Sequence, residues 1–117
     1  MVAVLTVADY RDSESWNQAR LAVYAILAFT ESFSRRNEHR KRATNIEHLS
    51  IAVLAIIAKG FEGTGDKNFL TKAANTIERL EQELRRAKQR GALNDVDTTL
   101  LKENLEAVKI SLKHIGP

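Results

Sequence analysis

Positive side chains gather in one short stretch of this 117-residue chain, SFSRRNEHRKRATN, residues 32–45. Lysine or arginine occupies five of its positions, one histidine lies among them, and Glu38 is its only acid. The chemistry open to such a cluster is the binding of phosphate groups, as point charges or through bidentate guanidinium contacts. We therefore predict a nucleic-acid-binding surface that includes Arg35, Arg36, Arg40, Lys41 and Arg42.

A second basic set lies further along the chain in LRRAKQRG, residues 84–91, and comprises Arg85, Arg86, Lys88 and Arg90. Both sets have a simpler explanation. A run of charge is most often a solvated loop, and cations at the end of a helix stabilise the negative end of its dipole. No aromatic side chain is interleaved with either set, so stacking on bases is not indicated. We expect binding that is largely independent of nucleic-acid sequence.

The groups that an enzyme or a metal site needs are missing from the sequence. His39, His48 and His114 belong to no Glu-x-x-His or His-Glu-x-x-His motif. The segment GFEGTGDKN, residues 60–68, lacks the Gly-Lys-Ser/Thr ending of a phosphate-binding loop, and we interpret it as a tight turn between helices. The absence of cysteine excludes disulfides and thiolate zinc ligands. We expect no enzyme, no cofactor and no metal.

Composition describes a folded domain whose charge is unevenly distributed. Hydrophobic residues make up 44% and charged residues 28%, which is ordinary for one globular domain. The net charge is +3, but residues 35–60 alone carry +4 and residues 1–34 carry −2, which favours a polyanionic partner. The apolar start MVAVLTVA lacks a basic flank and is too short to span a bilayer. We expect a cytoplasmic protein with no membrane partner.

Glycines divide the chain into segments whose apolar residues recur at helical spacing, and no alternating strand pattern is present. The spacing predicts a first helix that begins at Asp12 or Ser13, either of which can cap it, and runs to about Phe33. A second helix is predicted from about Arg42 to Lys59.

The third predicted helix starts near Asp66 and stops at Gly91, a residue that favours the left-handed conformation past a helix end. The fourth begins after NDVD, capped by Asn94, Asp95 or Asp97. Four helices joined by short loops predict an all-α, up-down four-helix bundle over residues 12–117. An extended arm is expected over residues 1–11.

The predicted helices differ in how they use their apolar residues. In the first helix, Trp16 should be a large anchor of the core. The acids of the third helix are interpreted as a solvated face with pairs such as Glu81 and Arg85.

The second helix contains IAVLAIIA, residues 51–58, which is apolar on every side. Because one face of each helix in a single small bundle meets water, this run predicts a subunit interface.

Two segments carry more specific motifs. YRDSESWNQAR, residues 10–20, has a Tyr-Arg-Asp opening followed by Trp and Ala, and residues 57–93 have Ile-Ala-x-Gly-Phe, a glycine loop, Phe-Leu, a leucine seam and Gly-x-Leu. In both, the chain resembles the four-helix-bundle proteins encoded in intervening sequences of bacterial 23S rRNA genes. The resemblance covers about residues 10–115. It departs from the family where Ile56 and Lys59 replace an Asn and a Glu.

The same fold occurs in the related accessory variability determinant proteins of diversity-generating retroelements. These resemble basic homopentameric barrels that bind a reverse transcriptase and nucleic acid. The resemblance therefore implies a homopentameric ring whose partners are its own copies, DNA or RNA, and a reverse transcriptase. The alternative is a protein-interaction or scaffold bundle of the intervening-sequence type, with no nucleic-acid role.

Overall fold

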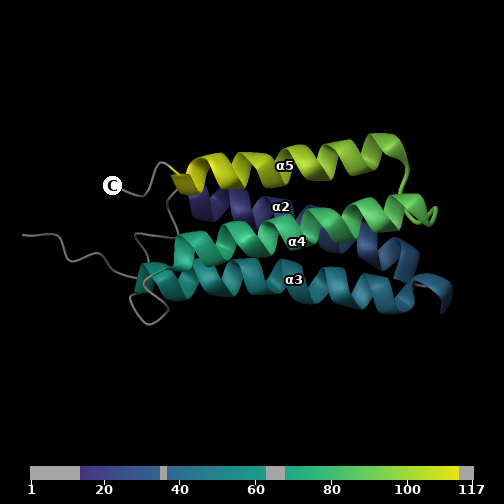
Figure 1. Cartoon of the computed structure of the whole chain (residues 1–117), viewed down its shortest axis with the longest axis horizontal. Helices are drawn as coiled ribbons and strands as arrows, with labels where there is room; N and C mark the ends of the chain where they lie inside the picture. Colours follow the sequence, from purple (N-terminus) through teal and green to yellow (C-terminus); the bar gives the residue numbers. More distant parts are fainter. Residues whose placement is uncertain (1–13, 35–36, 63–67, 114–117) are drawn as a thin grey trace, which may run out of the picture.

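The computed structural model describes residues 14–34, 37–62 and 68–113, and over these residues it contains four helices and no strand. The helices are α2 (Glu14–Ser34), α3 (Asn37–Glu62), α4 (Phe69–Gln89) and α5 (Asp95–Lys113) (Figure 1). The predicted all-α four-helix bundle is confirmed. The predicted arm, the caps at Asp12 and Ser13, and the cations Arg35 and Arg36 lie outside the described residues.

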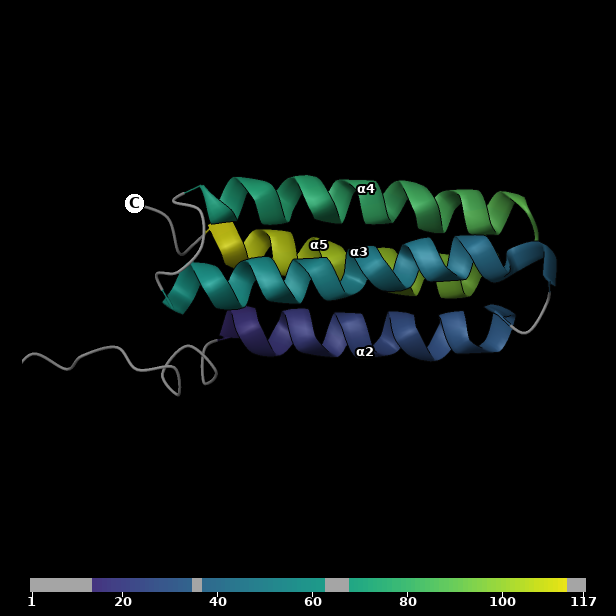
Figure 2. The same cartoon turned by 90° about the horizontal axis from the view of Figure 1, so that it is seen from below.

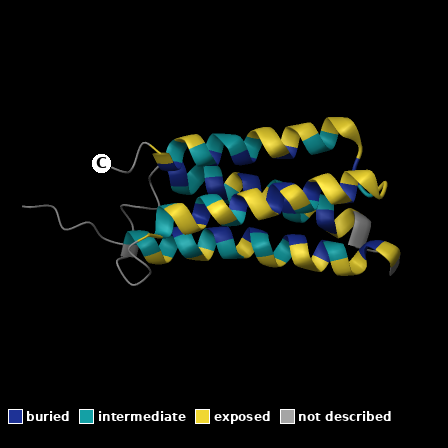
Figure 3. Cartoon of the chain, viewed as in Figure 1, coloured by how far each residue is buried: buried dark blue, intermediate teal, exposed yellow. Residues whose placement is uncertain are grey.

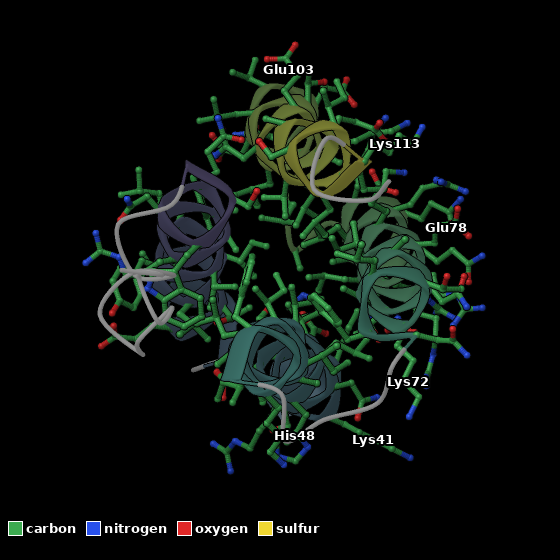
Figure 4. All side chains as sticks on the ribbon, turned by 90° about the vertical axis from the view of Figure 1, so that its left-hand side faces the viewer. Lys41, His48, Lys72, Glu78, Glu103 and Lys113 are labelled. Atoms are coloured by element: carbon green, nitrogen blue, oxygen red, sulfur yellow. The ribbon has the colours of Figure 1, made fainter. Side chains whose placement is uncertain are left out.

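The helices run alternately up and down and occupy the corners of a square. α2 packs against α3 and α5, and α4 packs against the same two neighbours, as the two side views show (Figures 1 and 2). Seen along the bundle, side chains fill the centre, while Lys41, His48, Glu78 and Lys113 point outward (Figure 4). In this arrangement the last turns of one helix lie level with the first turns of the next.

The core consists of buried aliphatic side chains that recur at helical spacing on the inner face of each helix (Figure 3). On α2, Ala19, Val23 and Ile26 are buried. Trp16 packs against this core but is itself partly exposed, so it covers the edge of the core and does not fill its centre. Each large aliphatic side chain that is fully buried contributes about 1.5–3 kcal/mol to folding. The other helices contribute Ala43, Ile46, Val53 and Ile57 of α3, Ala73, Ile77, Leu80, Leu84 and Ala87 of α4, and Leu101, Leu105, Val108 and Leu112 of α5.

The turn between α4 and α5 is fixed by backbone hydrogen bonds that end one helix and begin the other. The amide of Ala92 donates to the carbonyl of Ala87 at 2.8 Å, and that of Gly91 donates to Lys88 at 3.0 Å. With Gly91 at φ +80°, these bonds form a Schellman motif. Asn94 then caps α5, since its Oδ1 accepts the amide of Asp97 at 2.7 Å. Of the three predicted caps, Asn94 is the one used.

α3 is longer than the sequence pattern predicts at both ends. It begins at Asn37, five residues before Arg42, and it ends at Glu62, beyond Gly60. Two of our interpretations are therefore wrong. Arg40 and Lys41, which the prediction placed before the helix, lie on it, and Gly60 is a helical residue and not part of a turn. A Cβ at Gly60 would overlap the ring of Phe69, so the glycine allows α3 and the start of α4 to approach closely.

The apolar run IAVLAIIA presents two different faces. Val53 and Ile57 are buried, whereas Ile51 is 53% exposed and Ala55 is also exposed. Within the described residues, α3 is the one helix that is long and apolar enough to cross a membrane, since an 18-residue stretch of it has a mean hydropathy of 1.2. The core helix of a bundle meets the same criterion. The run therefore fills the core with one face and leaves an apolar face uncovered in the single chain.

Candidate nucleic-acid interface

The described members of the two predicted basic sets come together at one end of the bundle. Arg40, Lys41 and Arg42 lie on the first turns of α3, and the second set lies on the last turns of α4 and at its C-cap, Arg90. Because α3 and α4 are antiparallel neighbours, these turns are level with each other, at the right-hand end of Figure 1. We call this region, residues 38–42 and 83–102, the basic end. It contains eight basic and four acidic side chains, a net charge of +4.

Glu83 joins the two basic sets. Its Oε2 accepts a hydrogen bond from Arg42 Nη1 at 3.3 Å, and its Oε1 accepts one from Arg86 Nη1 at 2.8 Å. The Glu83 side chain is 15% exposed and that of Arg42 is 25% exposed, so this contact is partly shielded from water. The Glu83 carboxylate thus partly neutralises the charges of Arg42 and Arg86. It also holds Arg42 against α4, so Arg42 is not free to bind phosphate.

Four of the predicted cations have no acidic partner among the described residues. Arg40, Lys41, Arg85 and Arg90 are exposed and form no ion pair with any residue in the part of the chain that the structure describes. Lys88 is exposed but pairs with Asp95, with 2.8 Å between Nζ and Oδ1. Surface pairs of this kind contribute little to stability and exchange readily with other anions. The positive surface open to a polyanion therefore spans the first turn of α3 and the last two turns of α4.

Glu81 is not part of the solvated face that the sequence suggested. It is 8% exposed, and its Oε1 accepts a hydrogen bond from Lys109 Nζ at 3.1 Å, not from Arg85. Lys109 also pairs with Glu106 at 2.9 Å. Burial raises the pKa of Glu81, and the neighbouring Glu106 carboxyl raises it further, while Lys109 opposes both. The hydrogen bond from Lys109 lowers the pKa of Glu106.

Two features of the basic end were missing from the sequence prediction. Glu83 was the first, although its i to i+3 spacing from Arg86 is a recognisable signal. Lys102 was the second, because it lies on α5 and reaches the basic end only through the up-down topology. Within the described residues no group of three or more His, Cys, Asp or Glu side chains could hold a metal ion.

Comparison with known proteins finds no relative of this chain. No protein-family model, no curated protein and no solved structure matches the chain.

Proposed function

We propose that this chain is a non-enzymatic cytoplasmic accessory protein that binds the phosphate backbone of DNA or RNA with its basic end. The supporting observation is that cations from two distant parts of the sequence, Arg40 and Lys41 on α3 and Arg85 and Arg90 at the end of α4, lie at one end of the bundle with no acidic partner among the described residues. Such cations can meet phosphate without first giving up a contact within the protein. The released counterions then favour binding.

Assembly into a homo-oligomer, a ring of five in the resembled family, is part of this proposal. It is supported by large apolar side chains that the single chain leaves uncovered, namely Leu21 (62% exposed) and Tyr24 (56%) on α2 and Ile51 on α3. A ring would repeat the basic end in every subunit, so many weak phosphate contacts would add up. As in the resembled proteins, a reverse transcriptase would be the protein partner.

A protein-interaction scaffold is the second candidate function, and the exposed apolar side chains of α5 favour it. Val96, Leu100 and Ile110 are 76%, 47% and 55% exposed along α5. Val96 and Leu100 are four residues apart and share one face of the helix, and a contiguous exposed apolar patch can mark a protein contact. In that case the basic end would serve mainly to keep the protein soluble.

Neutralising the basic end should weaken binding to nucleic acid and reduce its dependence on salt. In the first variant, Arg40, Lys41, Arg85 and Arg90 are all replaced by Gln. For every phosphate that the variant no longer binds, the slope of log affinity against log salt should fall by about 0.9 on duplex DNA. Affinities for unrelated sequences should fall about equally. The measurement is fluorescence anisotropy with labelled DNA and RNA oligonucleotides at several salt concentrations.

The matched control removes four charges elsewhere, by replacing Lys59, Lys72, Arg79 and Lys113 with Gln. All four side chains are exposed and lie outside the basic end. This variant has the same net charge as the first, so it should bind more tightly than the first and retain a steeper salt slope. Equal losses in the two variants would mean that net charge alone attracts nucleic acid. No binding by the wild type at 50 mM salt would favour the scaffold.

The oligomer is tested by the mass of the unmodified chain in solution. Light scattering at micromolar concentration should give a multiple of the 13.1 kDa protomer, because the apolar side chains at positions 21, 24 and 51 would otherwise face water. Replacing Leu21 and Tyr24 by Gln should lower the measured mass. A monomeric wild type would remove the ring from the proposal and leave each bundle to bind with a single basic end.

A further inference from the structure

α5 carries two rows of side chains with the spacing of helix contacts. The first row faces the core of the bundle and is buried. The second lies on the outer face and recurs at intervals of four, three, four and three residues; we call it the α5 outer row, and it consists of Val96, Leu100, Glu103, Ala107 and Ile110. Four of its five side chains are exposed, and Ala107 is partly exposed. Intervals of four and three are those at which one helix packs along another, so this row is suited to a second helix from outside the chain.

α2 has a second row of the same kind. Its core row is buried, and its outer face carries a row at intervals of four, three and four residues, which we call the α2 outer row: Asn17, Leu21, Tyr24 and Ala28. The last three of these side chains are exposed. No charged residue occurs between positions 21 and 30. The α2 outer row is therefore also suited to contact with another helix.

The centre of the α5 outer row is occupied by an acid. Glu103 is exposed and forms no ion pair with any residue in the part of the chain that the structure describes, and Figure 4 shows its side chain pointing away from the bundle. If an apolar surface alone covered this row, the carboxylate would lose water without compensation, which is costly. The surface that covers α5 should therefore bring a cation to Glu103.

Arg20 supplies such a cation beside the α2 outer row. It precedes Leu21 and lies one turn from Tyr24 on the same side of the helix. Its side chain is half-buried, and it has no acidic partner among the described residues. Nη2 donates to Oδ1 of Asn17 at 3.1 Å, while Nη1 remains open to an acceptor from outside the chain. The α2 outer row thus lacks an anion, and the α5 outer row lacks a cation.

We infer that the α5 outer row of one subunit packs along the α2 outer row of a second copy, with Glu103 of the first subunit bound to Arg20 of the second. This inference rests on the proposed oligomer and names its contact. The two rows are different surfaces, so each subunit offers one row to each of two neighbours, and such contacts can repeat around a closed ring. The cations of α4 belong to neither row, so assembly leaves them available to nucleic acid.

Other coverings of the two rows satisfy the charges less well. If the α2 outer row packed against its own copy about a two-fold axis, the carboxylate of Glu103 would stay in water and the guanidinium of Arg20 would gain no anion. A different protein with a basic seam could cover α5, but it would leave the α2 outer row exposed. Contact between the two rows covers both and pairs both charges. A charged pair within an apolar seam also fixes the register of the two helices.

Exchange of the two charges tests the contact. Sedimentation velocity over a dilution series of the full chain gives the concentration at which half of the subunits are assembled. Arg20→Glu and Glu103→Arg, made singly, should each raise this concentration by about a hundredfold, because like charges would then face each other. The double variant restores an opposite pair and should bring the concentration back to within about tenfold of the wild type.

Two further variants separate the contact from general effects. Glu78→Arg makes the same charge reversal at an exposed position of α4 (Figure 4) and should leave assembly unchanged. Val96→Gln together with Leu100→Gln alters exposed positions without changing the charge, and it should weaken assembly even if Arg20→Glu does not fold.

The possible outcomes distinguish this contact from the oligomer itself. A wild type that assembles, and whose assembly is unaffected by Glu103→Arg and by the Val96 and Leu100 changes, overturns the contact but keeps the proposed oligomer. A double charge variant that assembles no better than the single variants overturns the pairing of Glu103 with Arg20. A wild type that is monomeric at every concentration overturns both the contact and the oligomer.

Discussion

Replacement of Lys109 by Met is expected to destabilise the bundle by about 4 kcal/mol at pH 8, a typical cost of leaving a buried charge without its partner. Lys109 lies between two carboxylates, 3.1 Å from Glu81 and 2.9 Å from Glu106. The Glu81 side chain is 7% exposed, so water cannot replace the lost ammonium group. Met retains most of the aliphatic length of Lys, so the change tests mainly the charge.

The loss should depend on pH, because Glu81 can regain stability by taking up a proton. Its pKa is already raised above the ordinary 4.5, first by burial and then by the Glu106 carboxyl. An acid with a raised folded-state pKa stabilises most at low pH, and this contribution disappears as the pH rises through that pKa. Removing Lys109 raises the pKa further. The difference between variant and wild type should therefore grow from pH 5 to pH 8.

Urea unfolding followed by circular dichroism at pH 5 and pH 8 measures both effects. In the double variant with Glu81→Gln and Lys109→Met, most of the stability should return, and the extra pH dependence should vanish. Lys113→Met, at an exposed position of the same helix, should change the free energy of unfolding by at most about 0.5 kcal/mol. A loss that is equal at both pH values would mean that packing of the lysine chain, and not the carboxylate, is responsible.

The bundle itself could be predicted because its core follows a simple repeat. Leu101, Leu105, Val108 and Leu112 recur at intervals of three or four, and all four are buried. Where a polar residue continues the buried row, the predicted helix was too short. His39 is 4% exposed and extends the inner row of Ala43 one turn toward the start of α3. Because His39 was counted with the cations, this turn was not included in the predicted helix.

The basic end could be predicted in its parts but not in its arrangement. The two sets of cations are visible in the sequence, and the up-down topology brings them to one end. Spacing alone could not tell which acid would pair with which cation. Glu78 is exposed, Glu81 is buried and Glu83 lies at the boundary with α3, although only five positions separate them. Successive helical residues differ by about 100° in direction, so small rotations of α4 decide each role.

Gly60→Ala is expected to destabilise the fold by about 3 kcal/mol, within the usual range for overpacking a close contact. This is opposite to the usual effect of Ala in a helix, where it is favoured over Gly by about 1 kcal/mol. The reason is that the new Cβ would overlap three carbons at the inner end of the Phe69 ring. That ring cannot move aside freely, because it packs against Phe61 with 5.7 Å between ring centroids.

A double-mutant cycle with Phe69→Ala isolates this contact. Phe69→Ala alone should destabilise the bundle because it removes a ring that packs on Phe61. In its presence, Gly60→Ala no longer has a ring to overlap, so the sign of its effect should reverse to a gain of up to about 1 kcal/mol from helix propensity. The four free energies of unfolding, measured in urea, give the coupling directly. If Gly60→Ala has the same effect in both backgrounds, Phe69 does not occupy the space above Gly60, and α3 and α4 are held together there by other side chains.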